Sequence, residues 1–339
     1  MSDHPGPRPQ PRRAGLPAFL RAPEWGLAVG IGAVVGAIYL LNTSGSFFQP
    51  ANRANLLHNV ALFGVLSLGA AVVIIAGGID LSVGSVVALS GVVAARLTTE
   101  WLPGAHKFGD EPHPALILGV VALTLLLGLA IGLFHALLIG ALRLPPFIAT
   151  LATMAGLRSV AILVSNNRSV NVPFDRFQML GRDNIYTVSI FALVALAMSV
   201  MMGATVLGRH LYALGGNEAA ARLSGLPIAR LKCAAYGLSG MLSALGGLLF
   251  TGNTGQAQGT MGVSYELFAI TAAVVGGCSL AGGVGSIRGT VLGLILIQVV
   301  INGTGLTITS IDSTQIEGLV LGTVVVLAVA FNQRFRRRG

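Results

Sequence analysis

The sequence contains few charged residues. Asp, Glu, Lys and Arg make up 10% of the 339 residues, whereas a soluble globular protein has about 25%. So few charges cannot cover the water-facing surface of a folded chain of this length, and an ordinary soluble protein is excluded. Hydrophobic residues reach 54% and the mean hydropathy is +0.80. We therefore expect the chain to be embedded in a membrane.

Cysteine and aromatic residues are also scarce. The two cysteines, Cys233 and Cys278, lie in apolar surroundings, so neither a disulfide framework nor a cysteine metal site is expected. The net charge is +9, but aromatics make up only 6%, and the basic residues stand at the ends of apolar runs. This pattern is typical of membrane topology signals, and no nucleic-acid partner, metal or cofactor is expected.

Glycine, in contrast, is abundant. The chain has 46 glycines, about twice the usual share of roughly 7%. Small residues recur at every fourth position in three places, which predicts close helix packing; these rows are Gly128-Gly132-Ala136-Gly140, Ser239-Ser243-Gly247 and Gly285-Gly289-Gly293.

Apolar runs long enough to cross a bilayer, about 20 residues each, predict an all-α polytopic membrane protein. We expect about ten transmembrane helices, with eight as the alternative, at residues 25–41, 57–76, 81–97, 115–141, 147–164, 185–206, 233–252, 266–281, 288–306 and 314–331. The Pro/Arg-rich residues 1–24 are expected to be a disordered basic tail. Residues 25–331 then form the membrane domain, and residues 332–339 form a short basic tail.

The distribution of basic residues predicts the orientation. With ten spans, both termini and the longest loop lie on one side, which collects fourteen of the 21 Lys and Arg residues, against six on the other side. The side richer in Lys and Arg faces the cytoplasm. We therefore expect a multi-pass protein of the plasma (inner) membrane with both termini cytoplasmic.

The loop 207–232 contains a short, well-delimited helix. Asn217 is a good N-cap, Glu218 and Arg222 are spaced for a favourable i,i+4 pair, and Gly225 is a natural stop. Pro227 suits the start of the next helix. Such a helix between two spans could be gripped by a soluble partner, although a plain capped loop helix explains the same pattern.

Two glycine-rich turns resemble each other. Residues 77–85, Gly-Gly-Ile-Asp-Leu-Ser-Val-Gly-Ser, are echoed by Gly-Gly-Cys-Ser-Leu at 276–280 and Gly-Val-Gly-Ser at 283–286. Both turns are expected on the cytoplasmic side. Transporters are often built from repeats, but glycine-rich segments also match by chance.

Four segments together resemble the ribose/xylose/galactose-type ABC sugar permeases. They are the loop segment 215–225 (Gly-Gly-Asn-Glu-Ala-Ala-Ala-Arg-Leu-Ser-Gly), residues 76–85, residues 144–151 (Leu-Pro-Pro-Phe-Ile-Ala-Thr-Leu) and residues 276–290. The resemblance runs from about residue 50 to residue 330. It implies a non-enzymatic permease subunit that imports a monosaccharide by alternating access.

The resemblance also implies partners. These are a cytoplasmic ABC ATPase, often with two nucleotide-binding domains in one chain, an extracytoplasmic sugar-binding protein and a second permease copy, besides the membrane lipid. The sequence itself has no Gly-x4-Gly-Lys-[Ser/Thr] phosphate-binding motif. The ATPase-coupling residues implied by the resemblance are Gly215, Gly216, Asn217, Glu218, Ala219, Ala220, Arg222 and Gly225.

Other polar residues are candidates for a gate or a solute pathway. The inner turn or gate would comprise Gly77, Gly78, Asp80 and Ser82, although a cap of the third span explains Asp80 equally well. Arg158 lies inside the fifth span, where it either snorkels to the outer headgroups or lines the pathway. The candidates for the pathway are Thr150, Thr153, Arg158, Asn166, Gln298 and Asn302, and each of them could instead make an interhelical hydrogen bond.

Two other classes of function are weaker. An ion-coupled secondary transporter of a small polar solute would need acids at the membrane midplane, whereas Asp80, Glu266 and Glu317 stand near span ends. A membrane enzyme would need a convergent catalytic set, and neither His-Glu-x-x-His nor Gly-x-Ser-x-Gly occurs. The sequence does not identify the sugar, nor does it distinguish a permease homodimer from a heterodimer.

Overall fold

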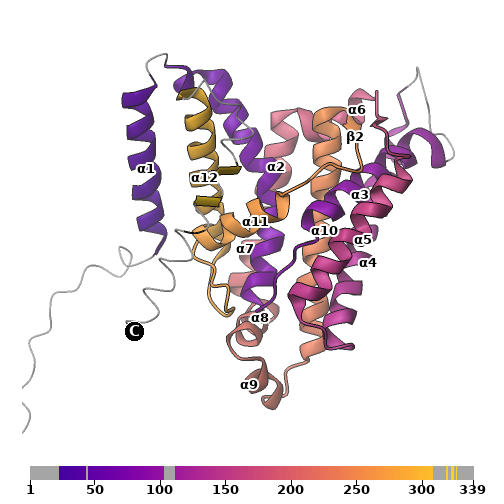
Figure 1. Cartoon of the computed structure of the whole chain (residues 1–339), viewed down its shortest axis with the longest axis vertical. Helices are drawn as coiled ribbons and strands as arrows, with labels where there is room; N and C mark the ends of the chain where they lie inside the picture. Colours follow the sequence, from indigo (N-terminus) through magenta and orange to yellow (C-terminus); the bar gives the residue numbers. More distant parts are fainter. Residues whose placement is uncertain are drawn as a thin grey trace, which may run out of the picture.

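The computed structural model describes residues 23–42, 45–102 and 111–307, together with positions 318, 319, 322, 323 and 326. The terminal tails and most of the predicted span 314–331 lie outside these residues. The described chain is almost entirely helical (Figure 1). A single short antiparallel pair, β1 (Val170–Asn171) with β2 (Gln256–Ala257), is the only sheet within it.

The helices follow the predicted spans closely. Their bounds are α1 Pro23–Leu41, α2 Pro50–Ile75, α3 Val83–Arg96, α4 Pro114–Gly140, α5 Pro146–Val164, α6 Asp175–Arg182, α7 Asn184–Ala204, α8 Val206–Gly216, α9 Glu218–Leu223, α10 Ile228–Thr254, α11 Tyr265–Val275 and α12 Ile287–Thr307. A π-helical turn, Leu97–Trp101, extends α3.

Seven helices of the described chain are long and apolar enough to cross a membrane, namely α2, α3 with its π-helical turn, α4, α5, α7, α10 and α12. Two shorter apolar helices, Trp25–Leu41 and α11, coincide with further predicted spans. The all-α polytopic fold is therefore confirmed, whereas the count of ten and the side of the termini stay predictions. The span predicted at 266–281 was too long, because Gly276 and Gly277 end α11 at Val275.

Helix α10 lies at the centre of the bundle. It packs against α4, α3, α2 and α6, and its buried face contributes to the main hydrophobic core together with α2, α7, α11 and α12. Helix α1 packs against α12 at the edge of the bundle (Figure 1). Helices α8 and α9 lie at one end, and α6 lies at the opposite end (Figure 1); we call these the α9 end and the α6 end.

The glycine row on α4 explains the closest helix pair. A Cβ atom on Gly128 would overlap the Gly240 carbonyl oxygen and lie 2.5 Å from the Ala244 Cβ, and one on Gly132 would lie 2.8 Å from the Gly237 Cα. The predicted close approach is thus confirmed at these two positions. The fourth member of the row, Gly140, has no atom within 4 Å of its Cβ position, so the row ends before it.

Candidate functional site

The α8–α9 segment has the local structure that its sequence predicts. The Asn217 side chain caps α9, because its Oδ1 accepts a 3.0 Å hydrogen bond from the Ala220 amide. Gly225 follows with φ +79°, and Pro227 precedes the first residue of α10. Thr205, a cap that the sequence analysis did not single out, starts α8 by accepting from the Gly208 amide at 3.2 Å.

Glu218 links α9 to α10. Its Oε1 accepts from Arg222 Nη2 at 3.1 Å, as predicted, and from Lys232 Nζ at 3.0 Å, which the sequence did not indicate. Burial alone would raise the pKa of Glu218, but the hydrogen bonds and charges of Lys232 and Arg222 together outweigh it and lower that pKa. Because the Lys232 side chain is only 17% exposed, against 65% for Arg222, Lys232 is the more constrained partner.

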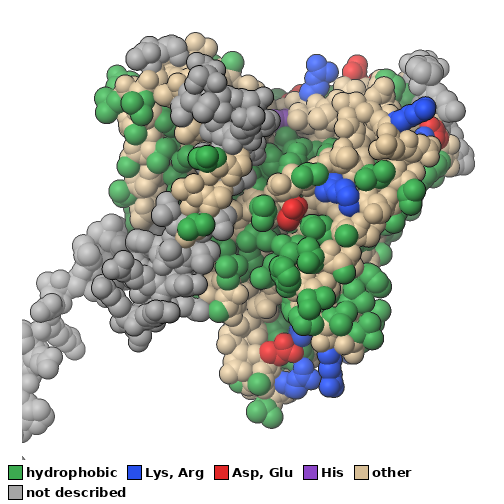
Figure 2. Space-filling view, in the orientation of Figure 1, with side chains coloured by type: hydrophobic (Ala, Val, Ile, Leu, Met, Phe, Trp, Pro, Cys, Tyr) green, Lys and Arg blue, Asp and Glu red, His purple; other side chains and the backbone are tan. Residues whose placement is uncertain are grey.

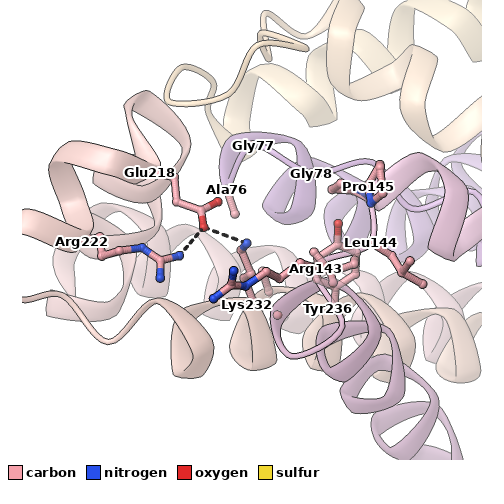
Figure 3. Close-up of a pocket in the computed structure, with 14 residues that line it drawn as sticks. Ala76, Gly77, Gly78, Arg143, Leu144, Pro145, Glu218, Arg222, Lys232 and Tyr236 are labelled. Atoms are coloured by element: carbon pink, nitrogen blue, oxygen red, sulfur yellow. Dashed lines mark hydrogen bonds and ion pairs between the residues drawn. The ribbon is translucent and has the colours of Figure 1, made fainter.

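Three of the segments that carry the family resemblance meet at one cavity at the α9 end. The cavity has a volume of about 680 Å³ and lies between α9, the turn after α2 and the turn between α4 and α5 (Figure 3). Its lining includes Gly77, Gly78, Arg143, Leu144, Pro145, Pro146, Glu218, Arg222, Lys232 and Tyr236. The structure therefore brings the predicted coupling helix together with the predicted inner turn.

The end of α8 wedges between the two glycine-rich turns. The Gly283 amide donates a 2.9 Å hydrogen bond to the Ile75 carbonyl oxygen. Gly215 lies against both residues, and a Cβ atom there would overlap the Ile75 oxygen and lie 2.6 Å from the Gly283 nitrogen. A Cβ atom on Gly77, whose φ is +84°, would lie 3.2 Å from the Gly215 Cα. Gly215 therefore has no room for a side chain.

The two turns share one backbone pattern. After α2, the amides of Ala76, Gly77 and Gly78 donate to Val72, Ile74 and Val73; after α11, the amides of Gly276, Gly277 and Cys278 donate to Ala272, Val274 and Ala273. Gly77 and Gly277 both have positive φ, +84° and +96°. The pattern pairs Gly77 with Gly277, one residue out of register with the sequence echo, and the ends of α5 and α9 have the same pattern. It is therefore a common way to end a helix, and the internal repeat stays a prediction.

Asp80 is almost fully buried and makes more contacts than a residue that only caps a helix. Its side chain is 2% exposed, and Oδ1 accepts from the Ser82 amide at 2.9 Å and from the Ser82 hydroxyl at 2.6 Å. Its Oδ2 accepts from the Ser239 hydroxyl on α10 at 2.8 Å. The interpretation as a cap was therefore incomplete, because Asp80 also joins the start of α3 to α10.

Arg158 is bonded to the backbone of a neighbouring segment. Its Nη1 donates to the backbone oxygens of Gly259, at 3.1 Å, and Met261, in the segment 258–264 between β2 and α11. The side chain thus holds that segment, and both expectations for Arg158, snorkelling and lining the pathway, stay predictions. Glu266, in the first turn of α11, lies within electrostatic reach of Arg158.

The other predicted pathway residues are scattered. Thr150 donates to the Ile79 carbonyl oxygen at 3.2 Å, and Thr153 lies 2.7 Å from His135 Nε2. Asn302 exchanges hydrogen bonds with Asn52 at 2.8 and 2.9 Å. Asn166 lines a cavity of about 460 Å³ with Arg96 and Glu100, and Gln298 is 5% exposed on α12. These contacts are interhelical or local, and the six candidates do not form one site.

A bundle of apolar helices that could cross a membrane, with a short helical segment at one end, defines a multi-pass membrane protein. The sequence matches the family described as "Branched-chain amino acid transport system / permease component" over residues 52–329. The chain belongs to this family. No solved structure matches it.

Curated relatives agree with this assignment. The chain is 37% identical to the ribose import permease protein of Bacillus subtilis (strain 168), over 88% of this chain and 90% of the relative. It is 38% identical to the ribose import permease protein of Escherichia coli (strain K12), over 89% and 92%. It is 34% identical to the galactose/methyl galactoside import permease protein of the same strain, over 85% and 88%. The chain is accordingly a multi-pass plasma-membrane protein whose relatives are sugar import permeases.

Proposed function

We propose that the chain is the membrane subunit of an ABC importer that carries a monosaccharide, ribose- or galactose-like, into the cytoplasm. A separate ATPase hydrolyses ATP, an extracytoplasmic binding protein delivers the sugar, and a second permease copy completes the membrane assembly. The α9 end is the cytoplasmic end. The observation that carries the proposal is the wedge of Gly215 between the two glycine-rich turns, directly beside the capped helix α9.

This arrangement supports coupling for a mechanical reason. Helix α9 is joined to α10 through Glu218 and Lys232, while the end of α8 contacts the turns after α2 and α11. A displacement of α9 by an ATPase therefore acts on both sets of helices at once, since a close-packed glycine contact leaves little slack. Gly215 to Gly225 form the proposed docking segment.

The cavity at the α9 end supports the same proposal. Its lining carries Arg143, Arg222 and Lys232 against Glu218, so cations exceed anions there. Arg143 stands in the turn between α4 and α5 with φ +56°, a conformation that non-glycine residues adopt uncommonly. Such a strained, exposed arginine suits contact with a partner better than it suits packing inside the bundle.

The test replaces residues 217–225 with a flexible Gly/Ser linker of equal length and asks whether the ATPase still co-purifies. We expect the linker variant to insert in the membrane but to lose the ATPase and ATP-driven uptake. A matched control replaces Leu196, which is 63% exposed on α7 and lies outside the docking segment, with Ala and should retain both. Undiminished assembly and transport by the linker variant would refute the docking role.

Solute and energy source are tested separately in membrane vesicles. Uptake of labelled ribose and galactose should stop when ATP is depleted and persist when an ionophore collapses ion gradients. The reverse result would favour an ion-coupled secondary transporter. ATP-driven uptake of labelled leucine, with no uptake of ribose or galactose, would instead indicate an amino-acid importer, as the description of the family suggests.

A further inference from the structure

Two ionisable side chains lie at membrane depth on one face of the bundle. Arg158 is twelve residues along α5 from Pro146, or roughly 18 Å along the helix axis. Glu266 lies at the first turn of α11, which is 11 residues long and so spans about 16 Å from the turn at the α9 end. Both groups therefore stand near the middle of a bilayer with a core of about 30 Å. The expectation that Glu266 stands near a membrane surface was wrong, because α11 has only 11 residues and begins inside the bilayer.

The segment 258–264, which precedes Glu266 and is held by Arg158, is not helical. The Gly259 and Met261 carbonyl oxygens accept from Arg158, and both Gly262 and Ser264 have positive φ, +75° and +68°. Non-helical backbone at membrane depth is tolerated only where it is buried in protein or lines a water-filled cavity. Gly259 and Gly262 of this segment are buried, whereas Val263 is 62% exposed, so burial within the bundle accounts for only part of the segment.

The carboxylate of Glu266 has a structural reason to be there. A Cβ atom on Gly84 would overlap the Gly262 carbonyl oxygen and lie 2.5 Å from Glu266 Oε2. Glu266 thus lies at the first turn of two helices, α11 and α3, and the positive ends of both helix dipoles favour a carboxylate there. Because the first turns of two helices meet at this point beside a non-helical segment, the site resembles the helix-terminus sites at which transporters bind solutes.

Charged side chains are otherwise concentrated toward the two ends of the bundle. Figure 2 shows acidic and basic side chains at both ends, and also an acidic and a basic patch at middle height over α11 and α5, bordered by hydrophobic side chains. A charge facing hydrocarbon is costly. This face is therefore not one that lipid covers.

We infer that Arg158, Glu266 and the segment 258–264 line the aqueous solute pathway and bind the hydroxyl groups of an uncharged polyhydroxyl solute. The inference deepens the proposed function and rests on it for the class of solute. Arg158 has donor N–H groups on Nε and Nη2 besides the Nη1 that holds the segment, whereas Glu266 and the carbonyl oxygens accept. The charges of Arg158 and Glu266 cancel, so the site favours a neutral solute.

Water access is tested with cysteine substitutions in a Cys233→Ser background, using the assembled importer in permeabilised membrane vesicles. Val263→Cys should react with a membrane-impermeant, positively charged methanethiosulfonate about tenfold faster than Leu193→Cys, since only a thiol in water ionises readily. Leu193 is a matched apolar control, 69% exposed on α7. Ribose should slow the reaction of Val263→Cys. Equal rates for the two cysteines would overturn the inference.

Solute binding is tested by transport kinetics. Arg158→Gln and Glu266→Gln should each raise the KM for ribose at least about tenfold, as expected when a hydrogen bond to a charged group is lost. Membrane insertion and ATPase co-purification should be retained, and a variant that merely fails to fold would lose both. Arg53→Gln, an exposed arginine at the first turn of α2, is the control. An unchanged KM in both variants would remove the binding role.

The two proposals fail separately. A reactive Val263→Cys in vesicles that transport no monosaccharide would refute the proposed solute class and leave the water-lined face standing. Ribose transport with an unreactive Val263→Cys and unaltered KM values would leave the importer standing and refute this pathway.

Discussion

The Gly283 amide donates a 2.9 Å hydrogen bond to the carbonyl oxygen of Ile75. This bond joins the turn after α11 to the last residue of α2, and the end of α8 packs directly against it. Two helix ends and the proposed coupling segment are thereby held at one point. The bond explains why glycine stands at several neighbouring positions, since the chains approach too closely for side chains.

Gly215→Ala should destabilise the protein, whereas Gly216→Ala should not. The new Cβ on residue 215 overlaps the Ile75 oxygen, but residue 216 has no atom within 4 Å of its Cβ position. Overpacking of this kind costs about 1–3 kcal/mol. The measurement is the melting temperature of the detergent-solubilised protein. Equal melting temperatures for the two variants would contradict the tight packing of Gly215 against Ile75 and Gly283.

The attachment of α9 to α10 should weaken in acid. The pKa of Glu218 is lowered from 4.5 in the folded protein, so its pairing contributes stability above about pH 4.5 and loses it as the pH falls through the lower folded value. Because the Glu218 side chain is 42% exposed, solvent screening limits the effect to about 0.2–1 kcal/mol. Amide hydrogen exchange of residues 218–223 should therefore be faster at pH 4 than expected from intrinsic rates alone.

Lys232→Gln provides the matching test. It should speed exchange of residues 218–223 at pH 7 and remove most of the extra acid sensitivity, while Arg230→Gln, an exposed neighbour, should leave both unchanged. High salt should act in the same direction as Lys232→Gln. Persistence of the pH effect in Lys232→Gln would exclude Lys232 as the main partner.

Ser239→Ala should cost more than Ser67→Ala. Ser239 donates to the buried Asp80 carboxyl group, whereas Ser67 donates only to the Phe63 carbonyl oxygen of its own helix. A partner left unsatisfied in a buried place costs about 1–3 kcal/mol, whereas a local hydroxyl bond of a helix contributes little. Thermal unfolding of both variants checks the order, and a larger loss for Ser67→Ala would show that Asp80 does not depend on Ser239.

Gly128→Ala and Gly140→Ala test whether the helix contact itself, or only the spacing of glycines in the sequence, determines the stability. Both glycines belong to one row in the sequence, yet only Gly128 lies against α10, at the Gly240 carbonyl oxygen. We expect Gly128→Ala to lower the melting temperature, because α4 must move away from α10, at a cost of about 1–3 kcal/mol. Gly140→Ala should be neutral or slightly stabilising. Similar effects at both positions would mean that the row acts as a whole.

Local interactions made part of the site predictable. The bounds of α9 follow from Asn217, Glu218, Arg222 and Gly225, which interact within four residues of one another or end the helix by their own conformation. The apolar runs fixed most spans for a similar reason, since a membrane segment must satisfy its backbone internally. These helix bounds and spans can be predicted without knowing how the rest of the chain folds.

Other features depended on residues that are distant in the sequence. Nothing near Asp80 indicates Ser239, and nothing near Arg158 indicates the carbonyl groups of Gly259 and Met261. The sequence does not distinguish polar residues of similar type within the spans. The six pathway candidates therefore include residues that only make interhelical or local hydrogen bonds, besides Arg158, which bonds to the non-helical segment 258–264. Only the packing of the helices separates these cases.

The sequence by itself determined that this protein is embedded in a membrane, which residues form most of its spans, and which loop contains a capped helix. These features follow from composition, hydrophobic length and capping, and each of these depends on short stretches of chain. The tertiary structure alone decided that the loop's Gly215 enters the junction of Ile75 and Gly283, and that the first turns of α3 and α11 meet at Glu266. Those relationships arise from close packing between elements far apart in the chain, and no local pattern encodes which elements will meet.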